Sequence, residues 1–184
     1  MVAEDRIDID IYKVVNRAIA ASDNLEDMAA QLTHLLVGAL GIKGSTIFVL
    51  NPDTEELEAL ASFGLSINYM NKGPILVKKS LDHQLRGEPI VIRDVSTSDR
   101  LQYPKDAEKE GIHAIISLPV KLHGKLIGVL RLYHYEKWDI SDQDLDSLMI
   151  FAENMGLALM YIRLLQAVKA VKETVGEIHP VWLN

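Results

Sequence analysis

The 184-residue sequence contains no cysteine. This absence excludes disulfide bonds, thiolate nucleophiles, cysteine-ligated zinc or iron–sulfur centres, and any cofactor tethered through a thioether. The beginning, Met1-Val-Ala-Glu-Asp-Arg6, lacks the apolar core of a signal peptide, and no run approaches the about 18 to 20 apolar residues that a membrane-spanning helix needs. We therefore expect a soluble cytoplasmic protein without a membrane partner.

Positive charge is also scarce. The chain has 19 Lys and Arg against 26 Asp and Glu, which gives a formal net charge of -7, and its basic residues are scattered. Because binding to nucleic-acid phosphates depends on clustered Lys and Arg, nucleic acid is not an expected partner. The composition, 48% hydrophobic and 24% charged, is typical of a globular chain, and the length suits one domain with helical extensions.

Patterns that mark catalysis are missing as well. The sequence shows no Ser-His-Asp set, no glycine-rich phosphate loop and no pair of carboxylates at a suitable spacing. No two of the six histidines lie four residues apart on one predicted helix, so we expect no metal site. A single histidine could still bind haem in an enclosed pocket, with His83 and His113 as candidates. We expect a protein that is not an enzyme, and the sequence identifies no particular cofactor.

Helical periodicity marks the beginning of the chain. Apolar residues recur every three or four positions over residues 7–21, and the same spacing resumes from Leu25 to Ala39. Asn24 is a predicted N-cap of the second helix, and Gly41 is its predicted left-handed C-cap. Two consecutive helices are therefore expected before the first strand.

A long helix is predicted at the other end, beginning after the capping residue Ser141. It carries two neighbouring apolar stripes, which is more than packing on one sheet requires, so we expect residues 7–21 and 145–165 to form a dimer interface. Leu148, Met155 and Ile162 are the side chains predicted to hold the two subunits together. Beyond Leu165 we expect the helix to project as a coiled-coil-like stalk.

Short β-branched and apolar runs fill the middle of the chain. The predicted strands cover residues 45–50, 57–63, 89–92, 114–122 and 125–133. Turn residues join the first pair at Asn51-Pro-Asp-Thr54 and the last pair at His123-Gly124, so both pairs are predicted antiparallel hairpins. Residues 64–87 and 94–111 are excursions from the sheet, with short helices predicted at 80–86 and 104–110.

Arg131 interrupts the apolar run of the last predicted strand. Counting back from the His123-Gly124 turn places Arg131 opposite Ile116 and Val129 opposite Leu118, with all of these side chains on one face. A charge on an apolar face needs a partner, either a carboxylate such as Asp94 or an anionic ligand. An ion pair and a ligand role are both open for this arginine.

Seven segments resemble, in order and spacing, those of the GAF domain, a sensory module of signalling proteins. They are Ala61-Ser-Phe-Gly-Leu65, Gly87-Glu-Pro-Ile-Val-Ile-Arg-Asp-Val95, Arg100-Leu-Gln-Tyr-Pro104, Glu110-Gly-Ile112, Ser117-Leu-Pro-Val120, Gly124-Lys-Leu-Ile-Gly-Val-Leu130 and Trp138-Asp-Ile-Ser141. The resemblance covers residues 24–166, with an N-terminal helix in residues 1–23 and a helical extension and tail in residues 167–184.

The resemblance implies a GAF/PAS-like α+β fold. Its antiparallel sheet has five or six strands in the order 2-1-5-4-3, and the N- and C-terminal helices cover one face. Loops and short helices from residues 64–87 and 94–111 would close a ligand pocket on the other face. The implied site residues are Asp94, Arg100 and Tyr103 from the covering segments, together with Ile116, Leu118, Val129 and Arg131 from the sheet.

Two departures narrow the subtype. The free-methionine sulfoxide reductases of this fold and covalent bilin carriers of the phytochrome kind use cysteine, which this chain lacks. The Asn-Lys-Phe-Asp-Glu signature of cyclic-nucleotide-binding members is also missing, since Asn71-Lys72 is not followed by Phe and an Asp-Glu pair.

The expected function is therefore a noncatalytic sensor that binds an unidentified small molecule. It would dimerise through its terminal helices and signal to a kinase, cyclase or transcription factor. A ligand-free dimerisation scaffold is the alternative, in which Leu76, Leu81, Leu85, Phe63 and Tyr103 fill the cavity. A noncovalent haem or bilin sensor is a third possibility.

Overall fold

The computed structural model describes residues 7, 9–22, 24–76 and 88–178. Six antiparallel strands form one sheet in the order β3-β2-β1-β6-β5-β4. They are β1 (Gly44–Asn51), β2 (Glu56–Phe63), β3 (Ile75–Leu76), β4 (Ile90–Ile92), β5 (Ala114–Leu122) and β6 (Lys125–His134). The predicted α+β fold and strand order are confirmed; the structure adds the two-residue strand β3 at one edge.

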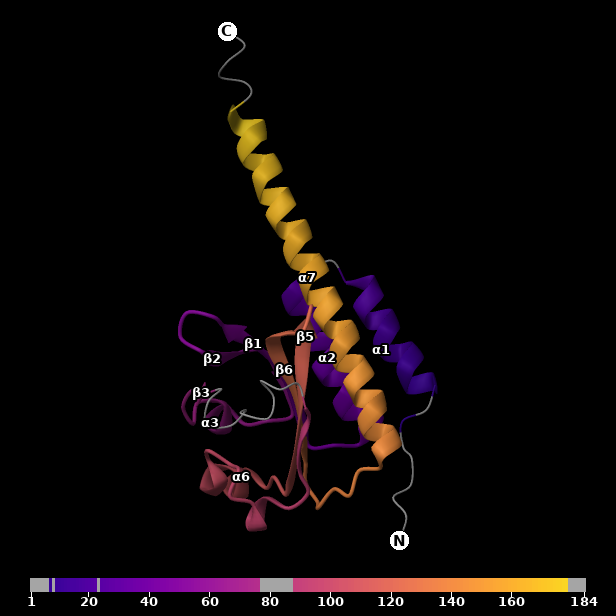
Figure 1. The fold of residues 1–184 in the computed structure, drawn as a ribbon, viewed down its shortest axis with the longest axis vertical. Helices are drawn as coiled ribbons and strands as arrows, with labels where there is room; N and C mark the ends of the chain where they lie inside the picture. Colours follow the sequence, from indigo (N-terminus) through magenta and orange to yellow (C-terminus); the bar gives the residue numbers. More distant parts are fainter. Residues whose placement is uncertain (1–6, 8, 23, 77–87, 179–184) are drawn as a thin grey trace.

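Three long helices cover one face of this sheet: α1 (Ile9–Ala21), α2 (Leu25–Leu40) and α7 (Asp142–Ile178) (Figure 1). The predicted caps of α2 are confirmed. The Asn24 side chain accepts hydrogen bonds from the backbone N–H groups of Glu26 and Asp27 at 2.9 and 3.1 Å, and Gly41 adopts a left-handed φ of 62°. These caps stop α2 just before the chain enters β1.

The shorter elements lie on the opposite face, away from the three long helices (Figure 1). They are α3 (Ile67–Met70), the 3-10 helix η1 (Val95–Thr97) and α6 (Pro104–Glu110). Pro104 occupies the first turn of α6, as predicted, while α3 was not expected from the sequence. The helix predicted at residues 80–86 lies outside the described residues.

The first half of α7 packs in the core between the sheet and α1. Ser141 Oγ accepts a hydrogen bond from the Asp144 backbone N–H at 3.0 Å, which confirms the predicted hydroxyl cap. At Gly156 the helix backbone lies against β5, where an added Cβ would come within 2.6 Å of the Lys121 carbonyl oxygen. Small side chains at such a crossing allow close helix–sheet packing.

The prediction that Leu148, Met155 and Ile162 hold two subunits together is wrong. All three side chains are at most 2% exposed within one chain and belong to its hydrophobic core. The periodicity gave the apolar stripe of α7 correctly, but it could not distinguish the sheet from a second subunit as the surface that covers it. Exposed apolar side chains follow a different line along the same helix.

From residue 163 onward, α7 extends beyond the body as a mostly exposed helix (Figure 1). This confirms the predicted projection.

The same helix corrects the expectation that no stretch of the chain is long and apolar enough to span a membrane. By length and composition, residues 142–174 would suit a membrane span, with a mean hydropathy of 1.5 in their most apolar window. The packing of Leu148, Phe151 and Met155 in the core accounts for much of that apolar character.

The β5–β6 hairpin turns at His123 and Gly124, both with positive φ (49° and 76°), as predicted for a two-residue turn. The register predicted from this turn is wrong beyond Lys121. An irregularity between Val120 and Lys121 inserts one extra residue on β6, so Ser117, not Ile116, lies opposite Arg131. A β-bulge of this kind shifts every later side chain to the other face.

Candidate functional site

A second apolar core separates the sheet from the short elements that cover it. Arg131, Val129 and Tyr133 of β6 share this face with Ser117 and Ile115 of β5, because side chains alternate along a strand. Ile112 and Ala107 approach from the α6 side. We call residues 66–76 and 94–112 the two covering segments.

Hydrogen bonds join the covering segments at two places. Near α3, Glu110 accepts from the Ser66 backbone N–H at 2.8 Å and from the Ser66 hydroxyl at 2.5 Å. Farther along, the Pro74 carbonyl accepts from Gln102 Nε2 and from the Tyr103 hydroxyl, both at 2.9 Å. The second set, which we call the Pro74 latch, holds the covering segments together over the sheet.

Gly73 makes the Pro74 latch possible. Its φ of +129° is rarely adopted by residues with a side chain, and an added Cβ would lie 2.6 Å from the Tyr103 hydroxyl oxygen. The ring of Tyr103 can therefore reach Pro74 only because residue 73 has no side chain.

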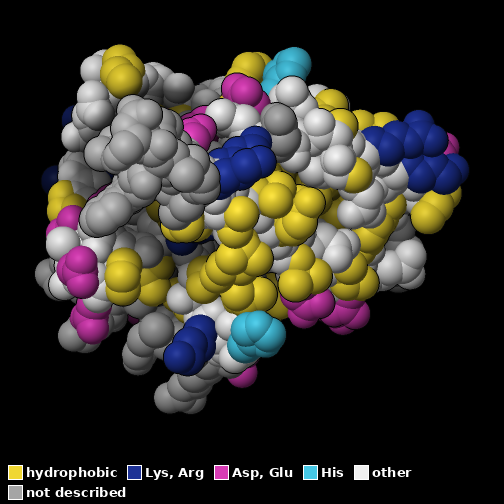
Figure 2. All heavy atoms as spheres, turned by 90° about the horizontal axis from the view of Figure 1, so that it is seen from above, with side chains coloured by type: hydrophobic (Ala, Val, Ile, Leu, Met, Phe, Trp, Pro, Cys, Tyr) yellow, Lys and Arg dark blue, Asp and Glu magenta, His cyan; other side chains and the backbone are white. Residues whose placement is uncertain are grey.

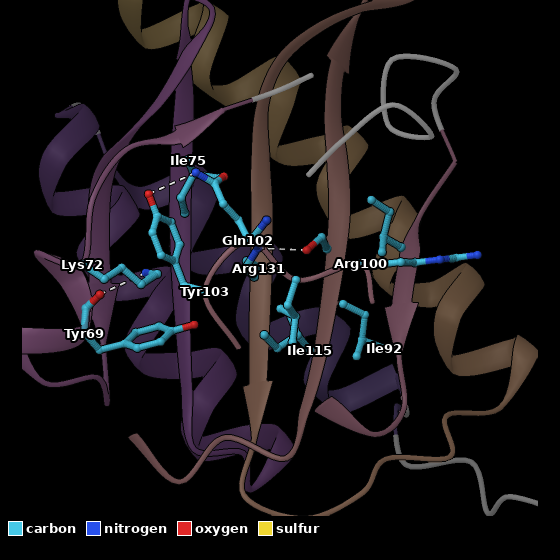
Figure 3. A pocket seen from close by; sticks show the side chains of 12 residues that line it. Tyr69, Lys72, Ile75, Ile92, Arg100, Gln102, Tyr103, Ile115 and Arg131 are labelled. Atoms are coloured by element: carbon cyan, nitrogen blue, oxygen red, sulfur yellow. Dashed lines mark hydrogen bonds between the residues drawn. The ribbon is translucent and has the colours of Figure 1, made fainter. Parts of the chain in front are cut away.

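Beneath the latch lies a cavity of about 20 Å³. This volume is enough for about one water molecule. Figure 3 shows the side chains around it, with Tyr69 and Lys72 on one side and Ile92 and Ile115 on the other. The described lining residues are Tyr69, Lys72, Ile75, Ile90, Ile92, Arg100, Leu101, Gln102, Tyr103, Ile115, Ser117 and Arg131.

Arg131 lies in the middle of the cavity floor and is only 8% exposed. Its Nε–H donates to Ser117 Oγ at 2.9 Å, and its guanidinium carbon lies 5.6 Å from the centre of the Phe48 ring. No ion pair between Arg131 and a carboxylate is found in the described part of the chain. The expected partner Asp94 is engaged elsewhere.

Lys72 reaches the same cavity from the end of α3. Its ammonium donates to the Tyr69 carbonyl oxygen at 3.0 Å and lies 3.7 Å from the centre of the Tyr69 ring. Burial, and then the positive charge of Arg131, lower the pKa of Lys72 to about 8, although Asp106 and Glu110 act in the opposite direction. The cavity is thus an unfavourable place for the positive charge it holds.

Two tyrosines complete the polar surroundings. Burial raises the pKa of both Tyr69 and Tyr133, whose rings meet edge to face with centres 5.9 Å apart. The Tyr133 hydroxyl makes no well-aligned hydrogen bond with a described residue, although Thr46 and Arg131 lie close enough to oppose the rise in its pKa. A buried hydroxyl without a good partner is uncommon in folded proteins.

The structure separates the predicted site residues. Arg100, Tyr103 and Arg131 line the cavity, and Val129 is buried on the same face of the sheet. Figure 3 shows the Arg100 side chain directed away from Arg131. Ile116 and Leu118 lie on the opposite face, in the core beneath the long helices, because of the bulge near Lys121. Their assignment to the pocket is therefore wrong.

Asp94 lies outside the cavity. Its carboxylate caps η1 by accepting from the Ser96 backbone N–H at 3.0 Å, and it pairs with Lys137 at 2.5 Å. The hydrogen bonds from Lys137 and Ser96 lower the pKa of Asp94 to about 2. This carboxylate serves a turn and does not balance the charge of Arg131.

Sequence reasoning missed four polar residues of the cavity: Tyr69, Lys72, Gln102 and Ser117. A correct register would have found Ser117, because a polar residue opposite Arg131 on a buried face suggests a hydrogen-bonded pair. Lys72 gave no such signal, because residues 64–76 lack the periodicity that assigns a side chain to a face.

Within the described residues, no three His, Asp or Glu side chains lie close enough together to hold a metal ion. His113 is exposed at the start of β5, which does not suit an enclosed haem ligand, and His83 lies outside the described residues.

Similarity to known proteins identifies the family and the fold of this chain. The family model described as GAF domain matches residues 24–159. No curated protein matched the chain. Many solved structures are similar to it, and three of them represent the range.

The GAF domain of a phosphoenolpyruvate-protein phosphotransferase from Coxiella burnetii is 19% identical, with a TM-score of 0.73 over 86% of this chain and 98% of that one. The free methionine-R-sulfoxide reductase from Neisseria meningitidis, solved with its substrate, is 16% identical (TM-score 0.70, 89% and 97%). A methyl-accepting chemotaxis protein fragment is 21% identical (TM-score 0.66, 84% and 99%). At these identities the likeness establishes the fold alone.

Proposed function

Because this chain belongs to the GAF domain family, whose members are signalling and sensing modules, we propose that it is a noncatalytic, cytoplasmic sensor of a small molecule. Binding under the covering segments would change how the terminal helices of a homodimer pack. A kinase, cyclase or transcription factor would receive the signal. The proposed sensor domain spans residues 24–166, and residues 167–184 extend it.

The observation that carries this proposal is the cavity above Arg131. It combines an apolar wall with several inward-facing polar groups, as ligand pockets commonly do. The segments that cover it are short, and the Pro74 latch joins them through only a few side-chain hydrogen bonds. Rearrangement of these segments would enlarge the cavity.

Dimerisation is supported by an exposed apolar line on α7, which we call the outer stripe. Its members are 48 to 64% exposed and follow one another at heptad spacing: Ile150, Leu157, Tyr161, Leu164, Val168 and Val171. Asn154 fills the one missing step. Seen from the end toward which α7 projects, hydrophobic side chains also gather across the middle of the molecule (Figure 2).

The residue types in the outer stripe favour a parallel two-stranded coiled coil. With Asn154, Tyr161 and Val168 at a positions, the d positions are filled by Ile150, Leu157, Leu164 and Val171. A β-branched a position with leucine at d favours two strands, and one asparagine at an a position fixes their register. A lone helix of this length is marginal in water, so the projecting part of α7 gains stability from a partner helix.

Native mass spectrometry of the freshly purified full chain tests the proposal. We expect a dimer that carries a retained small molecule of definite mass, released when the protein is denatured. A monomer, or a dimer from which no small molecule is ever recovered and to which none in a metabolite library binds, would contradict the sensor.

A ligand-free dimerisation scaffold is the second candidate, favoured by the small volume of the cavity. In that case the covering segments are permanently closed over the sheet. Hydrogen exchange separates the two functions: a sensor should show exchange at residues 66–76 that slows when ligand is added, whereas a scaffold should be protected from the start.

A further inference from the structure

The charges that line the cavity suggest the chemistry of its ligand. Lys72, Arg100 and Arg131 line it, and no described lining residue is acidic. This contrasts with the chain as a whole, in which acidic residues outnumber basic ones by 26 to 19. The cavity lining therefore has the opposite charge balance to the chain as a whole.

We propose that the pocket binds a small anion, through a carboxylate or phosphoryl group held between the Arg131 guanidinium and the Lys72 ammonium. This inference rests on the proposed sensor function and adds the chemical class of its ligand. The two cations belong to different parts of the fold, because Arg131 is fixed on the central strand β6 and Lys72 lies on a covering segment.

The geometry around Arg131 leaves donors for such a group. Its contact with Ser117 uses one of the five N–H donors of a guanidinium. The Ser117 contact also fixes the orientation of the side chain, so little conformational freedom is lost when an anion binds. Guanidinium groups bind carboxylates and phosphates through two parallel hydrogen bonds, which suits a ligand that enters above the strand.

The contribution of Lys72 differs, because its position depends on the covering segments. Its ammonium lies over the Tyr69 ring and 6.0 Å from the centre of the Tyr103 ring. An anion placed between Lys72 and Arg131 would relieve the repulsion between the two cations. It would also tie residues 66–76 to β6, which couples binding to the position of the covering segments.

The present cavity admits little more than a water molecule, so an organic anion must displace part of the Pro74 latch. Gln102 is the side chain best placed to move, because it belongs to the covering segment and lies between Tyr103 and Arg131 (Figure 3). Its carboxamide can exchange its bond to the Pro74 carbonyl for one to an anionic oxygen. The ligand is therefore expected to be small.

Proton uptake should accompany binding. The groups that act on Lys72 are Arg131 from β6, Tyr69 from α3, and Asp106 and Glu110 from α6. A bound anion adds negative charge next to the ammonium, which raises the pKa of Lys72 from about 8 toward its ordinary value. At pH 8.5 binding should take up a fraction of one proton, and affinity should fall as the pH rises above 8.

Isothermal titration calorimetry of the full chain with matched probes tests the inference. Succinate and inorganic phosphate are the anionic probes, and succinamide is the neutral isostere of succinate. At pH 7.5 we expect at least one of the two anions to bind, with succinamide at least tenfold weaker than succinate or undetectable. Lys72→Met should weaken anion binding by roughly tenfold and abolish proton uptake at pH 8.5.

Lys125→Met is the matched control, because Lys125 is exposed at the start of β6 and its replacement should leave binding unchanged. Circular dichroism shows whether each variant is folded. Equal affinity for succinate and succinamide, no binding of either anion, or full affinity in folded Lys72→Met would each overturn the inference. A neutral molecule retained in native mass spectrometry would refute the anion and leave the sensor intact, whereas a permanently protected pocket would refute the sensor itself.

Discussion

At the scale of single residues, the site depends on side chains that are costly where they lie. Arg131 and Lys72 place two positive charges around one small cavity, and the Tyr133 hydroxyl is buried without a well-aligned partner. Groups of this kind lower the stability of the empty protein, and they cluster at functional sites. Their energetic cost can be measured without knowing the ligand.

The pH dependence of stability reports the cost of Lys72. Its pKa is about 8 in the folded chain and 10.5 in the unfolded one, so between these values the unfolded chain binds more protons. The free energy of unfolding should therefore rise as the pH increases from 8 to 9.5, by about 1 kcal/mol after allowance for the partial exposure of Lys72.

Urea denaturation at pH 7.5, 8.5 and 9.5 measures this effect. Lys72→Met should remove the rise, and the difference between the two proteins isolates Lys72 from the tyrosines that titrate at higher pH. A parallel pH dependence in both proteins would show that Lys72 titrates normally.

Gly73 offers a second measurement at this scale. Gly73→Ala should destabilise the chain by about 1 to 3 kcal/mol, because the new Cβ collides with Tyr103 and the φ of +129° is strained. Hydrogen exchange should increase at residues 66–76. Gly38→Ala is the matched control: an added Cβ there meets nothing within 4 Å, so an alanine in the last turn of α2 should stabilise by about 0.5 to 1 kcal/mol. Equal effects of both changes would exclude a special role for Gly73.

At the scale of elements, each prediction succeeded where local chemistry determined the structure. Asn24 caps the start of α2 and Gly41 caps its end, as expected, and His123-Gly124 forms the expected turn. The bulge near Lys121 was not predictable, because nothing in an apolar run marks which residue is the extra one. That one residue moved Ile116 and Leu118 out of the predicted site and brought in Ser117.

Helix α7 shows the same limit in another form. Its sequence contains several apolar lines, and periodicity alone cannot say which of them packs on the sheet. The fold assigns Leu148, Met155 and Ile162 to the core and leaves the outer stripe exposed. Lys72 could not be placed either, because long-range packing, and not local pattern, brings α3 over the sheet.

The outer stripe can be tested by paired substitutions. Replacing Leu157 and Leu164 by Ser should weaken the dimer by more than about 100-fold, because each substitution removes a buried leucine from a d position of the coiled coil. Both side chains are about 60% exposed in one chain (61% and 60%), so its fold should be retained. Sedimentation equilibrium gives the association constant.

Leu148→Ala is the control for the outer stripe. Leu148 is fully buried in one chain, so its truncation should lower the free energy of unfolding by about 2 to 5 kcal/mol without breaking the dimer directly. A dimer that survives the double serine change would show that the subunits meet elsewhere.

At the scale of the whole molecule, a parallel dimer would place both sensor domains at the same end of the paired α7 helices. The projecting part of α7 would then carry a change in either domain along a single coiled coil. An antiparallel pair would put the two domains at opposite ends.

The absence of cysteine makes this arrangement directly testable. Val171→Cys introduces the sole thiol at a d position, and a parallel in-register pair should form an intermolecular disulfide in high yield under mild oxidation. Lys169→Cys should cross-link poorly, because Lys169 lies at a b position, on the face of the helix away from the outer stripe. Non-reducing gel electrophoresis compares the two. Equal yields from both positions would argue against this pairing.

The bulge at Lys121 lies between the hairpin turn and the strand positions that hold Arg131, so the turn should tolerate inserted residues. Arg131 is held by Thr46 on β1 and Ser117 on β5, and both pairings lie on the far side of the bulge from the exposed His123-Gly124 turn. Extra residues at this turn would therefore lengthen the hairpin without displacing Arg131. A reporter peptide inserted there should leave the pocket undisturbed, which makes the turn a suitable place to label the protein internally.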